Sequence, residues 1–462
     1  MKLNTFLPVI LWFWGGDAAA VEEPGYHVQS ILVEGNKVTK TPIIDREVVF
    51  QEGDFIPVNE WEEKLEQTRF NLINTNLFLE VNLSYSVDSL RAVDVRIVVK
   101  ERWYLSVLPY VILSDRSLNE WWYERGRDLR RLTYGLNVTK YNFTGNADSF
   151  QSGVYLGFAP HYHLSYSRPY VDRRKRFGVA ARVYYNSRRN MPYRTWNDKL
   201  AFFQSDSISL RRLGGVAEFQ YRKDYNYFHT AFLGIASNKI TDTVLAANPQ
   251  YYGSGLNRQF LVNLGYEYRA DFRDFRQYPL KGTYFAAGIN LFFVRDGKNQ
   301  TNLTVVANRY FPLAEKWFLE IGVRGKASFT RDQAYSLVSG LGYSGNIARG
   351  YELYVIDGQY FALNRNTLKF RAFRHRFDIH KIIPREQFST VPITLYPNVY
   401  LDYGYVRNFQ PERSNSALSN TLLVGGGVGL DVVTFYNVNV RTYYSVNRMG
   451  ERKLFFTIGR EF

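Results

Sequence analysis

The chain has 462 residues, a formal net charge of +15 and no cysteine. The lack of cysteine excludes disulfides, thiolate catalysis and cysteine-based metal sites. Aromatic residues make up 17% of the chain, yet the mean hydropathy is −0.31. This combination argues against a helical membrane protein and is typical of a β-barrel, in which only one face of each strand is apolar and aromatic girdles edge that face.

Residues 1–20 have the pattern of a secretory signal peptide. Lys2 provides the positive end, residues 6–14 form a short apolar core, and Ala18 and Ala20 are the small residues that precede a cleavage site. Loss of Lys2 and Asp17 together would leave the net charge unchanged. No later uncharged apolar run approaches the ~18 residues that a membrane-spanning helix requires, so we expect any membrane crossing to use strands.

Residues 26–102 predict a small α+β domain. Thr41 is expected to cap a short helix with Pro42 at its first position, and Asn59 with Glu62 resembles a capping box at the start of a second helix. That second helix should bury a stripe at helical spacing, which consists of Trp61, Leu65, Thr68 and Leu72. Strands are expected at residues 27–34, 77–85 and 93–99.

Residues 103–462 change to repeated alternating segments, separated by clusters of Gly, Asn, Asp, Ser and Arg. In residues 260–269, the clearest example, the even positions are all apolar and the odd positions are mostly polar or small. Such strands with unequal loops are typical of an outer-membrane barrel. A soluble sandwich would also alternate, but a chain of this length should then divide into domains with visible linkers.

An arginine and an aspartate stand out within this part. Residues 398–405 alternate strongly, and Asp402 falls on their polar face, which in a membrane barrel points into the lumen. Arg349 lies in a glycine-rich loop and could supply the cation that a lumenal carboxylate needs, because its rigid fork grips a carboxylate with two hydrogen bonds. The alternative is that each is simply one of many lumenal charges.

These residues resemble the BamA/TamA-type outer-membrane assembly proteins, also called the bacterial surface antigen family. The loop motif of that family is matched by Arg349-Gly350-Tyr351. Its strand motif, whose aspartate receives the arginine, is matched by residues 400–404, including Asp402 and Gly404. Residues 278–284 match a strand-entry segment, and the terminal Phe462 is the aromatic end such barrels have. Residues 26–102 resemble a single POTRA domain in their turn signals at 35–36, 53–54 and 72–78.

The resemblance implies a POTRA domain in the periplasm at residues 26–102, followed by an all-β transmembrane barrel of sixteen antiparallel strands in the cell outer membrane at residues 103–462. It implies a factor for assembly, insertion or translocation of outer-membrane proteins. The expected partners are unfolded β-barrel clients, accessory periplasmic or lipoprotein subunits and outer-membrane lipids. The alternatives are a dedicated secretion channel for one partner protein and a passive pore.

The mechanism implied has two parts. An exposed POTRA sheet edge, within residues 27–34 or 77–85, would add an incoming strand through main-chain hydrogen bonds. The first and last barrel strands, near residues 104–113 and 454–462, would meet at a lateral seam. Pro109, in the first strand, lacks an N–H for the ladder and so favours a weak seam with the last strand, which ends at Phe462. The alternative is that Pro109 lies at a strand end and has no effect.

Other patterns in the sequence point to no chemistry. Residues 340–345 match G-x-G-x-x-G but lack the strand–helix context of a dinucleotide site, so no cofactor is expected. His161 and His163 share a strand face without an evident third ligand, so no metal is expected. The basic run at 172–176 is interpreted as a turn, without nucleic-acid binding. We find no catalytic triad, and we therefore expect no enzyme, an outer-membrane phospholipase being the alternative.

Overall fold

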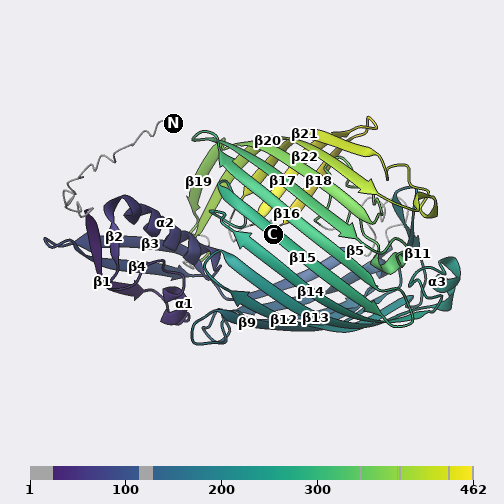
Figure 1. Ribbon diagram of the computed structural model, residues 1–462, viewed down its shortest axis with the longest axis horizontal. Coiled ribbons are helices and arrows are strands. Elements are labelled where there is room, and N and C mark those ends of the chain that lie inside the picture. Colours follow the sequence, from purple (N-terminus) through teal and green to yellow (C-terminus); the bar gives the residue numbers. More distant parts are fainter. Residues whose placement is uncertain are drawn as a thin grey trace, which may run out of the picture.

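The computed structural model describes residues 24–113, 128–343, 345–381, 383, 387–434 and 438–459. The expected signal peptide and Phe462 lie outside these ranges. The chain forms a small N-terminal domain and a large barrel, and the domain lies against one end of the barrel (Figure 1). We call this end of the barrel the near end and the opposite end the far end.

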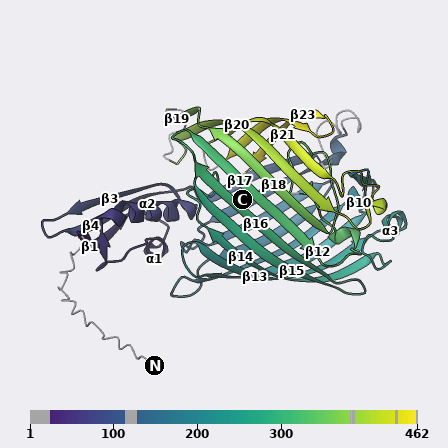
Figure 2. The same cartoon turned by 45° about the horizontal axis from the view of Figure 1, so that its top comes forward.

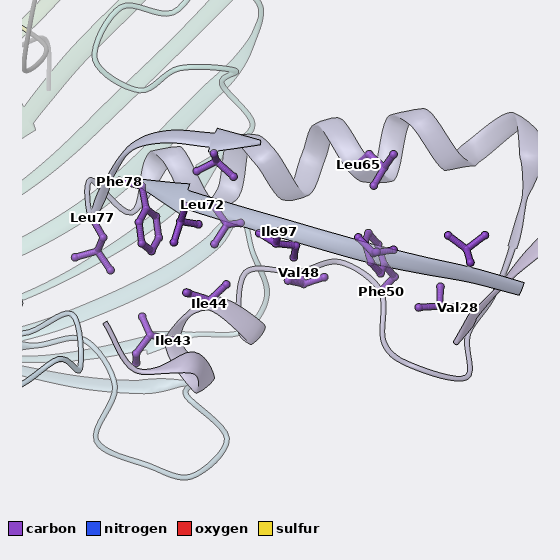
Figure 3. Close-up of a cluster of buried hydrophobic side chains, with 14 of the residues drawn as sticks. Val28, Ile43, Ile44, Val48, Phe50, Leu65, Leu72, Leu77, Phe78 and Ile97 are labelled. Carbon is purple, nitrogen blue, oxygen red and sulfur yellow. The ribbon is translucent and has the colours of Figure 1, made fainter. Parts of the chain in front are cut away.

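The N-terminal domain is a four-stranded sheet covered by two helices. Its elements in chain order are β1 (Gly25–Glu34), α1 (Thr41–Asp45), β2 (Phe55–Pro57), α2 (Val58–Asn74), β3 (Phe78–Val87) and β4 (Ala92–Glu101). The sheet order is β2-β1-β4-β3, so β3 is an edge strand. Apolar side chains of the helices and the sheet form one core, which includes Val28, Leu65, Leu72 and Ile97 (Figure 3).

The helix starts differ from the sequence expectation. Thr41 is the first residue of α1, and Lys40 occupies the N-cap position without a side-chain cap. Helix α2 begins at Val58, directly after Pro57, so Asn59 already lies inside the first turn and cannot act as a cap. The predicted capping box is therefore absent, because the chain enters the helix earlier than Asn59. The expected stripe of α2 is buried as predicted.

The barrel is closed and antiparallel. Its strands are β5 (Leu105–Leu113), β6 (Leu132–Tyr141), β7 (Ser149–Gly157), β8 (His161–Arg168), β9 (Phe177–Arg188), β12 (Leu210–Arg222), β13 (Tyr227–Ile240), β14 (Arg258–Asp271), β15 (Gly282–Val294), β16 (Gln300–Pro312), β17 (Trp317–Ser328), β18 (Tyr360–Phe370), β19 (Phe373–Asp378), β20 (Thr390–Arg407), β21 (Leu422–Val433), β22 (Asn439–Asn447) and β23 (Arg452–Gly459). Because β18 and β19 both pair with β20, they share one position in the wall. The wall thus has the sixteen strand positions expected.

The two faces of the wall differ as the alternation predicted. In β14, Phe260 and Leu264 are exposed on the outside, whereas Gln259 is buried. An apolar outer face with a polar inner face is the arrangement that a lipid-embedded barrel requires. None of the helices in the described ranges is long and apolar enough to cross a membrane.

The strand position shared by β18 and β19 contains a bulge. Lys369 lies opposite Asn398, and Phe373 lies opposite Leu395. The chain thus takes four steps on the β18–β19 side against three on β20, so one extra residue is inserted near Arg371. Odd-numbered residues of β18 face inward, and after the insertion the even-numbered residues of β19 do so.

The far end carries additional structure. A two-stranded hairpin, β10 (Met191–Trp196) and β11 (Lys199–Phe203), and a short helix, α3 (Asp242–Ala247), lie there (Figure 2). No helix was expected after residue 103; α3 has only six residues, too few to carry a sequence periodicity. The described residues also include three single 3₁₀ turns: η2 (Leu129–Arg131), η3 (Tyr335–Leu337) and η4 (Pro411–Arg413).

Candidate functional site

The loop between β17 and β18, residues 329–359, folds into the lumen. Its apolar residues Leu341, Tyr351 and Ile356 join a buried cluster with wall residues of β18, β20 and β21, among them Leu363 and Leu423. The burial of these side chains stabilises an inward position of the loop, since the same side chains would otherwise face water at the far end.

The tip of the loop places Arg349 against Asp402. Arg349 Nε donates to Asp402 Oδ2 at 2.9 Å, and Nη2 donates to Oδ1 at 2.6 Å. The backbone N–H of Arg349 adds a third hydrogen bond to Oδ2 at 3.0 Å. The carboxylate is 0% exposed. Two guanidinium donors and one backbone donor therefore satisfy a charge that water cannot reach.

Three neighbours complete the arginine site, and single-sequence reasoning did not assign them a role. Tyr400 places its ring 4.0 Å from the Arg349 guanidinium carbon, a cation–π contact. The carbonyl of Asn366 accepts from Nη2 at 3.2 Å. A second cation, Arg365 Nε, lies 3.8 Å from Asp402 Oδ2. Arg365 lies opposite Asp402 in the β18–β20 register, a pairing that no local sequence signal reveals.

Glycines make room for the loop tip. A Cβ atom at Gly425 of β21 would lie 1.8 Å from the carbonyl oxygen of Arg349, so only glycine permits this approach. Gly350 has a φ of +96°, a conformation that L side chains rarely adopt. At Gly404 a Cβ would lie 3.0 Å from Leu341 Cδ1, so this glycine also accommodates the loop.

Tyr351 and Gly350 bind the loop tip to the wall as well. The Tyr351 hydroxyl donates to the carbonyl of Val424 at 3.3 Å. The side-chain amide of Asn447 donates to the carbonyl of Gly350 at 2.9 Å. The loop tip is thus attached to β20, β21 and β22 by separate contacts.

Below the loop tip, the lumen holds a polar cavity of about 190 Å³. It contains further opposite charges on the wall, such as Lys369 Nζ, 2.8 Å from Glu320. This pair joins β18 to β17, and a second pair, Arg441 with Asp431 at 3.5 Å, joins β22 to β21. The wall around the loop tip is therefore a network of neutralised charges.

At the far end, the β10–β11 hairpin bridges two loops. The Asp198 carboxylate accepts from the backbone N–H groups of Ala417 and Leu418 at 2.9 and 3.0 Å. Its backbone carbonyl accepts from Val355 N, within the inserted loop, at 2.8 Å. These bonds join the hairpin, the β20–β21 loop and the inserted loop.

At the near end, the N-terminal domain is joined to the barrel by a buried ion pair. Glu47, which follows α1, is 1% exposed and receives two hydrogen bonds from Arg222 at the end of β12; the Nη2–Oε2 distance is 2.7 Å. The hydroxyl of Tyr170 also donates to Glu47 at 2.8 Å. Burial alone would raise the pKa of Glu47, but the charge and hydrogen bonds of Arg222 outweigh it, so that the net pKa is lowered.

Other contacts of the domain reach four near-end turns of the barrel. Besides Tyr170, these turns contribute the carbonyl of Gly145, which accepts from Lys40 N at 3.0 Å, and the hydroxyl of Tyr225, which donates to the carbonyl of Val48 at 2.6 Å. Gln277 donates to Asn76 at 2.6 Å. All four turns lie between β6 and β15, so this set of contacts ties the domain to one side of the rim.

The wall closes where β23 meets β5. Elsewhere in the wall, neighbouring positions pair over runs of six to thirteen residues. Within the described parts of β5 and β23 no comparable run joins the two. Pro109 lies in the middle of β5, opposite Leu136 of β6, so it is not at a strand end.

The remaining sequence candidates stay apart from this site. His161 and His163 lie on β8 with ring centroids 5.3 Å apart, beside Tyr155. Among the described residues, no group of three potential ligands surrounds them or any other point. The basic run 172–176 lies in the turn between β8 and β9.

Comparisons with known proteins agree with this architecture. Residues 142–376 match the Omp85 superfamily domain, and residues 26–102 match the POTRA model, described as a surface antigen variable number repeat. The chain therefore belongs to the Omp85 superfamily, with one POTRA domain at its N-terminal side. No curated protein matches the sequence significantly.

Solved structures show the same fold at low sequence identity. BamA from Haemophilus ducreyi lacking POTRA domains 1–3 is 16% identical, with a TM-score of 0.52 over 94% of this chain and 84% of that one. CdiB from Escherichia coli is 12% identical, with a TM-score of 0.55 over 94% of this chain and 76% of that one. These likenesses concern the fold alone.

The Arg349→Ala variant should destabilise the barrel by ~3–5 kcal/mol, because it removes the two guanidinium hydrogen bonds of the buried Asp402 carboxylate and leaves only the more distant Arg365 as a cation. The matched control is Arg413→Ala, which breaks an exposed pair with Asp332 and should cost ~0–1 kcal/mol. The temperature at which the folded band is lost in heat-modifiability gels measures both. Equal losses in the two variants would contradict the role assigned to the buried pair.

The domain–barrel junction should weaken in acid. Because the folded-state pKa of Glu47 is lowered from its ordinary value of 4.5, the stabilising effect is present above that value and is lost as the pH falls through the folded pKa. Spin labels on cysteines at Glu63 and Lys316 should report a broader distance distribution in acid. Glu47→Gln should broaden it already at pH 7, and an unchanged distribution in that variant would refute the junction's dependence on Glu47.

Proposed function

We propose that this protein captures unfolded outer-membrane clients at its POTRA domain and inserts them through a lateral seam of its barrel. Membership in the Omp85 superfamily places the chain among proteins of outer-membrane protein insertion or secretion. The finer assignment depends above all on two features of the described residues: a loop held inside the lumen, and a seam between β5 and β23 without a long paired run.

The blocked lumen argues for exit through the wall. The inserted loop is held by Arg349 and by apolar packing, and the β10–β11 hairpin bridges it at the far end through Asp198. A client that moved straight through would have to break this buried pair. The bilayer core contains no water that could hydrogen-bond the free backbone groups of a client strand. The edge of an opened wall strand can supply these hydrogen bonds instead.

The seam between β5 and β23 is the favoured place for opening. Within the described residues, β5 has a long paired register with β6, and no comparable register joins it to β23. Pro109 lacks the N–H that a fully paired strand would use. An opened seam would expose the edges of β5 and β23 to a client strand that has reached the bilayer.

The POTRA domain offers the capture step. β3 is the edge strand of its sheet and is paired on one side only, with β4. Its exposed edge can add an extended segment through main-chain hydrogen bonds. The POTRA domain lies in the periplasm in this proposal, with outer-membrane lipids around the barrel and accessory periplasmic or lipoprotein subunits as further partners.

Cysteine pairs introduced between β5 and β23 should abolish client insertion when oxidised and restore it on reduction. The chain has no cysteine of its own, so each engineered pair is unambiguous. The control is a pair at Leu233 and Leu264, which lie opposite each other in β13 and β14. Insertion of a purified barrel client into liposomes is the measurement, and full activity of the oxidised β5–β23 pairs would refute the gate.

Depletion of the protein distinguishes the proposed function from the alternatives. Proteomics of the outer membrane should show a broad loss of barrel proteins. Loss of one or two proteins would instead indicate a dedicated secretion channel. A passive pore would conduct strongly and steadily in planar bilayers, whereas a barrel blocked by its loop should conduct little.

A further inference from the structure

The described chain contains a large groove between the POTRA domain and the barrel rim, which extends from the β14–β15 turn, at Asp274, to the β19–β20 hairpin. Its volume is about 480 Å³. One wall is formed by the start of β3, and the other by the hairpin of β19 and β20. In Figures 1 and 2, β19 lies at the end of the barrel that faces the domain.

The β19–β20 hairpin extends beyond both neighbouring strands. The register between β17 and β18 ends at Trp317 and Phe370, so β19 passes the end of β17. The described register between β20 and β21 ends at Thr394 and Val433, four residues after β20 begins, although the Thr434 hydroxyl still donates to the carbonyl of Pro392. The hairpin therefore projects from the rim towards the POTRA domain.

The two faces of the hairpin are chemically opposite. Phe373 and Phe377 are both exposed, and they continue the apolar outer face of the wall. Because of the bulge near Arg371, Arg374 and Arg376 lie on the inner face and line the groove. The arginines thus point away from the lipid side of the wall and towards the POTRA domain.

The groove carries an excess of positive charge. Five Arg and Lys side chains line it together with His375, namely Arg69, Lys100, Arg102, Arg374 and Arg376, against two acidic ones, Glu80 and Asp274. The difference is +3. Arg69 is already paired with Glu66 outside the lining, at 2.9 Å. Within the described ranges, Lys100, Arg374 and Arg376 form no ion pair. One of the acids, Asp274, already accepts hydrogen bonds from its own turn, at Phe275 N and Leu280 N.

We propose that this groove binds an extended client segment rich in Asp and Glu, with β3 offering backbone hydrogen bonds and the hairpin offering positive charge. The inference rests on the proposed function. It specifies that the client segment is acidic and that the β19–β20 hairpin is a second contact surface besides β3. Anionic lipid is disfavoured as the occupant, because the arginines lie on the face opposite Phe373 and Phe377. Unpaired arginines facing a groove attract a carboxylate-bearing chain and accelerate its encounter.

The test uses the full chain in nanodiscs and a fluorescent twelve-residue peptide in which apolar residues alternate with Asp and Glu. The acidic peptide should bind on the order of tenfold more tightly than its Asn/Gln counterpart. The double variant R374E/R376E should remove that difference. The matched control R173E/R174E makes the same change of charge in the exposed turn between β8 and β9. This control should retain the affinity difference between the two peptides. Equal affinity of wild type and R374E/R376E for the acidic peptide would overturn the proposal.

A photo-crosslinking residue locates the peptide. Placed at Thr394, on the inner face of β20, it should capture the acidic peptide; at the adjacent Ile393, on the outer face, it should not. If R374E/R376E alters recruitment of phosphatidylglycerol and leaves peptide binding unchanged, the groove is a lipid site and the proposal fails. Depletion proteomics tests the insertion function separately from the groove. Outer-membrane barrels could be unaffected by depletion while the acidic peptide still binds, or they could be lost broadly while the peptide does not bind.

Discussion

A single desolvated charge pair organises the interior of this barrel. Asp402 has no contact with water, and within the described ranges all hydrogen bonds to its carboxylate come from Arg349, while Arg365 adds a second positive charge at 3.8 Å. Since Arg349 belongs to the loop and Asp402 to the wall, the pair makes the position of the loop a condition for a satisfied wall. The apolar cluster around Leu341 and the glycine at 425 both depend on the loop staying there.

At the near end, the POTRA domain is attached asymmetrically to the barrel rim. The buried pair of Glu47 and Arg222 and the four turns between β6 and β15 hold the POTRA domain on one side of the rim. The groove begins beside the last of these turns, at Asp274, and extends to the β19–β20 hairpin, whose strand β20 also carries Asp402. The rigid attachment thus leaves room for a chain next to the part of the wall where the loop is attached.

Much of the fold could be read from the sequence because its signals are local. Alternation in residues 260–269 fixed the two faces of a strand, and the spacing of Trp61 and Leu72 fixed the buried side of a helix. The motifs around Arg349 and Asp402 suggested a pair across 53 residues. What failed was finer: a capping box was expected at Asn59, but Pro57 already sets the chain for helix entry.

Other features had no local signal at all. Arg365 faces Asp402 only through strand register, and Glu47 meets Arg222 across 175 residues. No sequence pattern marks the one-residue insertion near Arg371 either, yet it determines which side chains of β19 face inward and which face outward. Deleting one residue there would exchange the two faces of β19: Arg374 and Arg376 would move to the outer face, and Phe373 and Phe377 would face the groove. A single inserted amino acid therefore determines which face of β19 is apolar and which is cationic.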